Sequence, residues 1–383
     1  MKRVRFMRAL WFIPFFFALP QILSSQTSYI HLSAESSVDT ANQAVGAVFR
    51  VWEQYLNSHP DSTYANPYWA ESEQGRYNPF DLVGHTWWNP SLYRNMQRCK
   101  CRVLSISPCA GSYLIRTMFY VAPHGDSGSV TVCSIIQTGA RMEKGSYKLC
   151  NALPINTRYW ETEQVGSIRY IFPQDHQFNR ALAASMNRFV DSLAGVWHLE
   201  VVPIDYYFAD DLDRVAKALG FDYWPAEGNI SGRRGFTDYR NRIVYSGGSD
   251  EWYPHEIVHV YMIPLFPKAH YFFQEGYATL LGGSQGHDLS WHIRRNYEYL
   301  KNHPNVDVLS FKGVDPFVGP SYYIGGLLCK MAEEKGGLPL LRKLMTYGPE
   351  DQDLYRAMHD VFSVGKKDLN SFLRTQLAWY ATR

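Results

Sequence analysis

The sequence of 383 residues predicts an α+β protein, in which an N-terminal α+β domain with an antiparallel sheet is followed by a small sheet and a mostly helical C-terminal half. Two observations support this fold class. A helical pattern over 40–56 precedes three short strand-like runs, at 101–106, 112–121 and 129–138, and this order is typical of an antiparallel sheet covered by a helix. After Asp250 the apolar residues follow helical spacing everywhere outside the loops.

Each segment in this order has its own apolar pattern. In the first helix, apolar residues recur at the spacing of one helical face: Ala44, Val45, Val48, Phe49, Val51, Trp52 and Leu56. The second region adds, in order, a strand at 167–172, a helix at 179–193, an apolar run at 198–208, a helix at 210–219 and a strand at 242–245. We expect one domain over 27–160 and a second domain over 166–383. Three roles are open for the first domain: it narrows a cleft, inhibits as a pro-segment or binds a partner.

The first 25 residues are typical of a secretory signal peptide. A basic head with Lys2 and Arg3 precedes the apolar run 9–23. A membrane anchor is the alternative, but the run is shorter than the roughly 20 apolar residues of a bilayer span, and two prolines interrupt it. The sequence predicts cleavage near Ser25, a secreted or periplasmic protein, and no membrane span after cleavage.

Charge and cysteine content narrow the function classes. The full chain carries a net charge of +2, and removal of residues 1–25, with four basic and no acidic groups, leaves −2. Without a basic stripe, no nucleic-acid binding is expected.

Five of the six cysteines lie within 99–150. Because an exported protein meets an oxidising compartment, we expect disulfides there, in a pairing that the sequence leaves open. Cys329, in an apolar stretch, is expected to be a buried free thiol.

The motif that carries chemistry is His255-Glu256-Ile257-Val258-His259, an H-E-x-x-H pattern. Residues four apart lie on one face of a helix, one turn apart, so both imidazoles can bind one Zn²⁺ ion. Glu256 is rotated away from that pair and can serve as a general base toward water. A helix with two incidental histidines is the alternative interpretation.

The surrounding residues favour a helix that buries this motif. Ser249 or Asp250 is expected to cap the helix, Pro254 falls in its first turn, and Pro264 is expected to end it. The other helical positions are apolar, so burial of two imidazoles and a carboxylate would be costly without a partner. A bound metal ion removes most of that cost.

The third ligand decides the kind of metal site, since a catalytic zinc has three protein ligands plus water and a structural zinc has four. The best candidate is Glu275, a carboxylate within the apolar and aromatic stretch 271–279. Gly276 is expected to let this second helix approach the first one closely. Three further candidates are interpreted as surface or loop residues: His270, His287 and Asp288.

With these residues the chain resembles the gluzincin zinc metallopeptidases of the MA-like superfamily, the group that includes thermolysin and the aminopeptidase N-like catalytic domains. Their pattern is an H-E-x-x-H helix and then a second helix with an E-G-x-A-like segment. His255, His259 and Glu275 match the metal ligands, and Glu256 matches the general base. The resemblance covers about 166–383 and implies a gluzincin-type catalytic domain with one Zn²⁺ ion.

The resemblance also implies an activity, that of a secreted zinc-dependent peptidase acting on peptides or proteins. Segment 321–328 resembles the tyrosine-bearing helix of the group, which makes Tyr322, or its neighbour Tyr323, the candidate oxyanion donor. The G-x-M-E-N element that holds the free amino end of a substrate in the aminopeptidase N-like enzymes is absent from 225–249. An endopeptidase is therefore favoured over an aminopeptidase.

Three other functions stay open. The chain could be a catalytically inactive binding protein with a peptidase fold, a zinc amide hydrolase acting on a non-peptide substrate, or a disulfide-rich adhesion module with a vestigial metal helix. The intact Glu256 argues against an inactive protein, because a dead site usually loses its base or a ligand.

Overall fold

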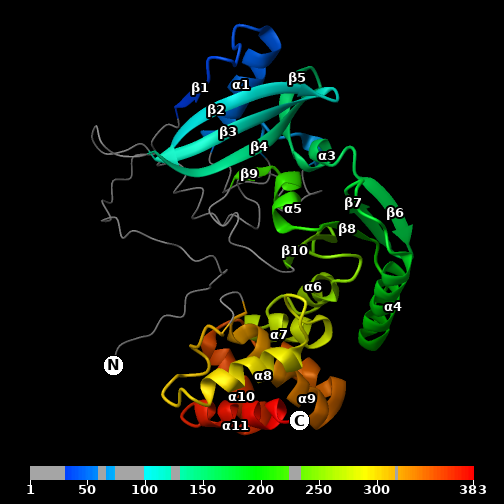
Figure 1. The fold of residues 1–383 in the computed structure, drawn as a ribbon, viewed down its shortest axis with the longest axis vertical. Coiled ribbons are helices and arrows are strands. Elements are labelled where there is room, and N and C mark those ends of the chain that lie inside the picture. The colour runs from blue at the N-terminus through cyan, green and yellow to red at the C-terminus, as the bar shows by residue number, and fades with distance from the viewer. Residues whose placement is uncertain (1–30, 59–65, 74–98, 122–129, 224–233, 315–317) are drawn as a thin grey trace.

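Two β-sheets and a helical half make up the protein (Figure 1). The structure, a computed structural model, describes residues 31–58, 66–73, 99–121, 130–223, 234–314 and 318–383. The first sheet lies at one end of the molecule, and the helices that follow the second sheet fill the other end. This arrangement confirms the mixed α+β fold class. The expected signal peptide at 1–25 lies outside the described residues.

The first sheet has the strand order β1-β2-β3-β4-β5, and β9 pairs with β4 off this path. Its strands are β1 (Leu32–Ala34), β2 (Lys100–Cys109), β3 (Ser112–Val121), β4 (Thr131–Glu143), β5 (Ser146–Cys150) and β9 (Phe221–Tyr223). The pairs β2–β3, β3–β4 and β4–β5 are antiparallel, and the short edge strand β1 is parallel to β2. The antiparallel sheet predicted from the three strand-like runs is therefore confirmed.

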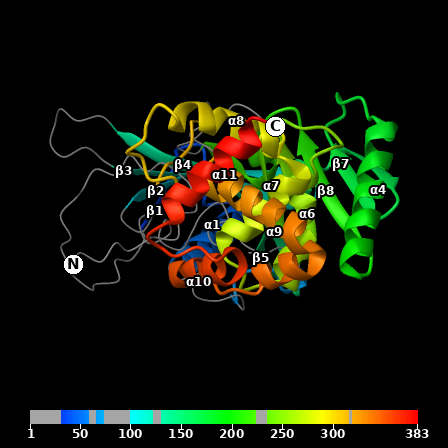
Figure 2. The same cartoon turned by 90° about the horizontal axis from the view of Figure 1, so that it is seen from below.

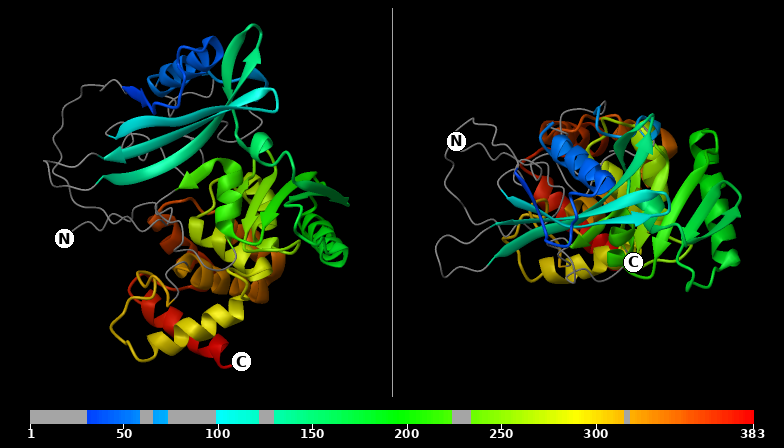
Figure 3. Two further views of the ribbon diagram at one scale, coloured as in Figure 1. Left: turned by 45° about the horizontal axis from the view of Figure 1, so that its top comes forward. Right: turned by 90° about the horizontal axis from the view of Figure 1, so that it is seen from above.

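Helix α1 (Gln43–Leu56) lies against one face of this sheet (Figure 3). It begins at residue 43 rather than 40 because the Asn42 side chain accepts hydrogen bonds from two N–H groups of the first turn and so caps the helix. Its apolar face enters the core of the sheet, where Trp52 donates Nε1–H to Thr117 Oγ1 of β3 at 2.8 Å. Helix and sheet thus bury one common face, as the sequence pattern requires.

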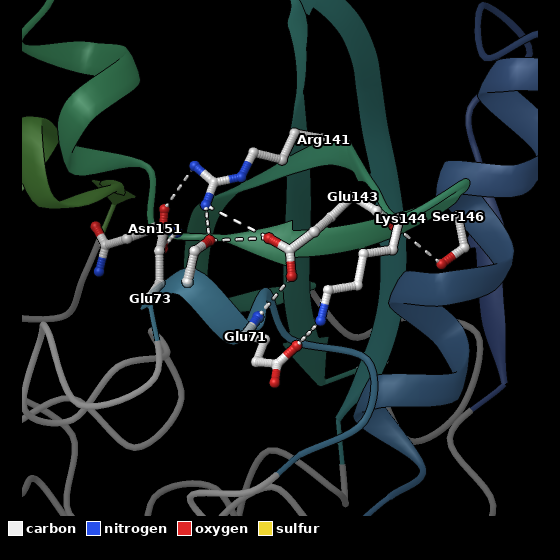
Figure 4. A network of polar contacts seen from close by, with 8 residues as sticks. Glu71, Glu73, Arg141, Glu143, Lys144, Ser146 and Asn151 are labelled. Carbon is white, nitrogen blue, oxygen red and sulfur yellow. Dashed lines mark hydrogen bonds and ion pairs between the residues drawn. The ribbon is translucent and has the colours of Figure 1, made fainter.

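A network of charges attaches the short turn η2 (Glu71–Glu73) to the β4–β5 hairpin (Figure 4). Arg141 of β4 places Nη1 3.1 Å from Glu73 Oε1, and the backbone N–H of Asn151 donates to Glu73 Oε2 at 2.7 Å. Lys144 pairs with Glu71 at the exposed end of the network. Exposed pairs contribute little to stability. Glu73 is only 3% exposed, so its two contacts hold the turn on the sheet.

The second region of the chain returns to the first sheet. Helix α5 (Leu212–Leu219) leads into β9, which pairs with β4 in antiparallel register. The core that contains Trp52 also contains Tyr207 and Tyr245 from the second sheet. Strand β9 is therefore the strand that the later region adds to the first sheet. The division into domains over 27–160 and 166–383 stays a prediction.

The second sheet has the strand order β10-β11-β8-β7-β6. Its strands are β6 (Glu161–Val165), β7 (Ile168–Phe172), β8 (Ile204–Ala209), β10 (Arg234–Asp238) and β11 (Ile243–Gly247). Strands β7, β8 and β11 are parallel, and β6 and β10 are antiparallel edges. The predicted strands at 167–172 and 242–245 are confirmed. Of the apolar run 198–208, only the part from residue 204 onward forms a strand.

Helix α4 (Arg180–Trp197) covers one face of the second sheet. Side chains alternate between the two faces of a strand. Tyr206 and Phe208 of β8 therefore join the core that includes α4, while Tyr207 joins the core shared with the first sheet. The sheet is covered on both faces, which explains why nearly all the residues of β8 and β11 are buried.

After residue 250 the described residues form helices and loops, with one isolated bridge between Ser284 and His287. The helices are α6 (Pro254–Leu265), α7 (Tyr271–Gly282), α8 (Leu289–Leu300), α9 (Pro320–Met345), α10 (Asp351–Phe362) and α11 (Leu369–Ala381). Figure 2 views this half from below, with α11 in red. The predicted helical half is confirmed. Along the described ranges, none of the helices has both the length and the apolar character that a bilayer crossing demands.

The expected disulfides are not formed in the structure. All six cysteines lie in described ranges, and none is joined to another by a disulfide. Cys329 is fully buried, as predicted.

Gly276 brings α7 into contact with α9, and not with α6 as the sequence suggested. A Cβ atom added to Gly276 would lie 2.1 Å from the carbonyl carbon of Gly325 on α9, and one added to Gly325 would lie 1.9 Å from the carbonyl oxygen of Phe272. The glycine of α7 that lies against the α6 backbone is Gly282, where an added Cβ would lie 2.3 Å from the His255 nitrogen. Two backbone contacts therefore fix where α7 lies.

Gly276→Ala is expected to lower the free energy of unfolding by about 3 kcal/mol, at the upper end of the usual cost of overpacking. The three atoms nearest to the added methyl group are backbone atoms of Gly325 and Gly326, so no flexible side chain can move away to relieve the clash. Chemical denaturation measures the effect. Gly195→Ala on α4 is the matched control, because no atom of the described residues lies within 4 Å of an added Cβ there, and a helical alanine is expected to stabilise slightly. Equal stability changes in the two variants would contradict the contact.

Candidate metal centre

The H-E-x-x-H motif lies on α6, as predicted, and is buried. His255, Glu256 and His259 are 3%, 5% and 6% exposed. The helix ends at Leu265, one residue after Pro264, which lies in its last turn.

The predicted cap of α6 is wrong. The N-cap residue is Tyr253, whose side chain makes no capping bond. Asp250 Oδ1 instead accepts the N–H of Trp252 at 2.9 Å, and Ser249 Oγ bonds Ser246 Oγ at 2.6 Å. Pro254 in the first turn removes one N–H that would otherwise need a partner.

Three ligand atoms converge between α6 and α7. His255 Nε2 lies 3.2 Å from His259 Nε2, and Glu275 Oε2 lies 3.4 Å from the first and 3.6 Å from the second. Zinc bonds of about 2.0–2.1 Å at tetrahedral angles place neighbouring ligand atoms roughly 3.3–3.4 Å apart. The triad therefore has the spacing of three corners of a tetrahedral zinc site. Among the described residues, no fourth His, Cys, Asp or Glu joins this group.

Hydrogen bonds orient the two imidazoles toward this centre. His255 Nδ1 lies 2.6 Å from the carbonyl oxygen of Gly283, which follows α7. Since a carbonyl can only accept, Nδ1 carries a proton, and Nε2 is the ring nitrogen that is left to bind a metal ion. His259 Nδ1 is buried and has no hydrogen-bond partner within the described part of the chain, so the polar contacts of that ring lie on its Nε2 side. Both rings present Nε2 to one point, which fits a shared cation.

The charges of the triad are coupled. Burial alone would raise the pKa of Glu275, but the two imidazoles outweigh burial and hold this pKa well below its usual value. Burial lowers the pKa of His259, but the neighbouring Glu275 carboxylate outweighs burial and raises it. A proton on His259 and a metal ion therefore compete for the same place beside Glu275.

Glu256 is held apart from the triad by β10. Thr237 Oγ1 lies 2.8 Å from Glu256 Oε2 and 2.9 Å from the Glu256 carbonyl oxygen. Gly235 lies against the same side chain, where an added Cβ would come within 2.9 Å of Glu256 Cγ. Neither residue was identified from the sequence, because a lone threonine or glycine on an edge strand carries no local signal of this contact.

The structure separates the two adjacent tyrosines of α9. The Tyr322 ring stacks on His255 at a centroid distance of 5.9 Å, and its hydroxyl is hydrogen-bonded to that of Tyr271 at the start of α7. Tyr323 is fully buried in the core and donates to the carbonyl oxygen of Phe311 at 3.4 Å. Of the two candidates, Tyr322 is therefore the one beside the metal triad.

The other candidate ligands lie outside the triad and have different partners. His270 caps α7, with Nδ1 accepting the N–H of Phe272, and burial lowers its pKa to about 4. His287 stacks on Trp291 at 3.8 Å between ring centroids. Asp288 caps α8, where its Oδ1 accepts the N–H of Trp291 at 2.7 Å. Each thus has a local structural role, although His270 is buried rather than at the surface.

Comparisons with known proteins find similarity only among solved structures, since no family model and no curated protein sequence matches the chain. The M1 zinc metallopeptidase from Deinococcus radiodurans is similar at 12% identity and a TM-score of 0.33, over 74% of this chain and 63% of that one. A mutant of the enzyme from this organism, bound to a Tyr-Ser-Ala substrate, matches at 12% identity, a TM-score of 0.32 and the same coverage. The chain spans less than two thirds of these enzymes, and its function is inferred from its own metal triad.

Proposed function

We propose that the chain is a zinc-dependent peptidase in which His255, His259 and Glu275 bind one Zn²⁺ ion. The observation that carries this proposal is the 3.2–3.6 Å spacing of the three ligand atoms. No fourth protein ligand joins them among the described residues. Since structural zinc sites are closed by four protein ligands, a set of three favours a catalytic site.

Two residues of the chain have separate roles in the proposed hydrolysis, Glu256 and Tyr322. When bound, Zn²⁺ supplies Lewis acidity toward water and the scissile carbonyl. Glu256 accepts the proton of the attacking water and passes it to the leaving amine. Tyr322 donates its hydroxyl to the oxyanion that develops on the carbonyl. Burial first, and then the Glu275 carboxylate, raise the pKa of Tyr322 well above its usual value, so the phenol keeps its proton at neutral pH.

Tyr322→Phe is expected to lower kcat about 10²–10³-fold, the usual effect of removing one oxyanion donor. The bound zinc and KM should change little, because the hydroxyl is not a metal ligand. Steady-state kinetics on a fluorogenic peptide, with metal analysis of the same sample, measure this. Tyr323→Phe is the control and should keep kcat within about twofold, since its hydroxyl bonds the carbonyl oxygen of Phe311 in the core, away from the metal triad. Equal losses in both variants would exclude the assignment of Tyr322.

Thr237→Val is expected to lower kcat roughly 10-fold or more, because a hydrogen bond to a charged group contributes about 1.5–3 kcal/mol. Thr237 acts through Glu256 and is a positioning residue, so KM and zinc content should stay unchanged. Thr237→Ser keeps the hydroxyl and should restore kcat. A loss that the serine variant shares would instead indicate a packing role for the methyl group.

We further infer that the protein is exported and cleaves its substrates internally. The signal-like residues 1–25 support export, and the absent G-x-M-E-N element supports internal cleavage. Digestion of a peptide library by the chain without residues 1–25, with and without 1,10-phenanthroline, tests the activity by mass spectrometry. We expect internal cleavage that the chelator stops and added zinc restores.

The other functions give different results in that digest. Stepwise loss of amino-terminal residues would indicate an aminopeptidase, and hydrolysis confined to a panel of non-peptide amides would indicate an amide hydrolase. Peptides retained without cleavage would indicate a binding protein. Any of these three results would contradict the proposed endopeptidase.

A further inference from the structure

Two cysteine sulfurs of the first sheet are in contact. Cys99 lies directly before β2 and Cys133 lies on β4, and their Sγ atoms are 3.5 Å apart. The two residues are 34 positions apart in the sequence and come from opposite sides of β3. We propose that Cys99 and Cys133 form a disulfide when the folded protein meets a small-molecule disulfide such as oxidised glutathione.

A β-bulge frees Cys133 from the sheet ladder. In the register of β3 and β4, Phe119 is opposite Ser134 and Tyr120 is opposite Val132, so Cys133 has no partner residue on β3. A bulge bends its strand and redirects a side chain. Cys133 can therefore meet Cys99, directly before β2, although β3 lies between β2 and β4.

The other cysteines are poorer partners. Cys101 and Cys150 are 1% and 2% exposed, and burial raises the pKa of each thiol to about 12. Cys329 is fully buried in the core of the helical half. Cys109 is half-buried but lies at the other end of β2 from Cys99. Cys99 and Cys133 are both half-buried, so an oxidant can reach them.

The pair also has the required reactivity. The Cys99 thiol donates to the Cys133 sulfur, and this hydrogen bond lowers the pKa of Cys133 to about 7. A thiolate is the nucleophile in disulfide exchange. The Cys133 thiolate attacks one sulfur of oxidised glutathione and releases one glutathione thiolate. The Cys99 sulfur, after losing its proton, attacks Cys133 and releases the second. Two electrons pass to the glutathione sulfurs, and the two cysteine protons end on two reduced glutathiones.

The disulfide would close a loop that contains the whole of β2 and β3. Such a crosslink stabilises a protein mainly by restricting its unfolded chain. We expect the Tm of the oxidised protein to be on the order of 5 °C above that of the reduced protein.

Peptide mapping tests the pairing directly. Trypsin cleaves after Arg98, Lys100, Arg102 and Arg116 and next after Arg141, so Cys99 and Cys101 fall in separate dipeptides and Cys133 falls in peptide 117–141. The full chain is equilibrated with oxidised and reduced glutathione, alkylated, digested without reductant and analysed by mass spectrometry. We expect peptide 99–100 joined to peptide 117–141, and loss of this species after reduction.

Variants separate this pairing from its competitors. Cys99→Ser and Cys133→Ser should each abolish the joined species, while Cys101→Ser and Cys109→Ser should keep it. Because the wild-type map alone decides the outcome, a variant that fails to fold does not prevent the test. Peptide 117–141 found alkylated, bound to glutathione, or joined to any other cysteine peptide would overturn the proposal.

Discussion

Glu256→Gln is expected to abolish peptide hydrolysis, with kcat reduced about 10²–10⁴-fold, while one zinc ion per chain is retained. Glutamine keeps the size of the side chain and can still bond Thr237, but it cannot accept the proton of the attacking water. The carboxylate makes no bond to His255, His259 or Glu275, so its loss leaves the three ligands in place. Kinetics and metal analysis of the same preparation measure both quantities.

Glu298→Gln is a suitable control for the loss of a carboxylate. This residue lies on α8 and pairs with Lys301 at the surface, so its replacement should leave kcat unchanged. If Glu256→Gln kept wild-type turnover, another group would have to be the base.

His259→Ala is expected to weaken zinc binding at least about 100-fold, since even changes to groups that only orient a ligand cost 10–100-fold in metal affinity. Activity should be lost with the metal. Zinc should raise the Tm of the wild-type protein but not that of the variant, because a ligand stabilises only the state that binds it. Competition with a fluorescent zinc chelator measures the affinity.

His287→Ala is the matched control for the loss of an imidazole. His287 was itself a candidate ligand in the sequence, but it is exposed and stacks on Trp291. Its removal should leave zinc affinity and activity unchanged. Loss of zinc in this variant, or its retention in His259→Ala, would contradict the triad.

Local geometry explains which parts of the site the sequence could predict. His255 and His259 share a helix face whatever the rest of the fold does, since four residues make about one turn. Glu275 lies on the next helix, and its apolar surroundings and the family resemblance made it the candidate third ligand. The structure brings its Oε2 to 3.4 and 3.6 Å from the two imidazoles.

The remaining contacts depend on packing that no local pattern reports. Thr237 reaches Glu256 from an edge strand, and the partner of His255 is the backbone carbonyl of Gly283, which any residue could supply. The choice between Tyr322 and Tyr323 depends on the rotation of α9 against α6. Gly276 was assigned to the wrong neighbour for the same reason, because a small residue indicates a close approach but not the helix that makes it.

The apolar patterns predicted which segments form helices and strands more accurately than they predicted where those segments begin and end. The strand predicted at 112–121 matches β3. The predicted helix over 40–56 begins later, at residue 43, because Asn42 caps it. The cap of α6 could not be read from Asp250, whose carboxylate is used by the preceding turn.

Anomalous diffraction at the zinc absorption edge, from a crystal of the purified chain, would locate the metal ion itself. We expect a single strong peak about 2 Å from His255 Nε2, His259 Nε2 and a Glu275 carboxylate oxygen. A peak elsewhere, for example among the cysteines of the first sheet, or no peak at the triad of a crystal grown with zinc, would contradict the proposed zinc site.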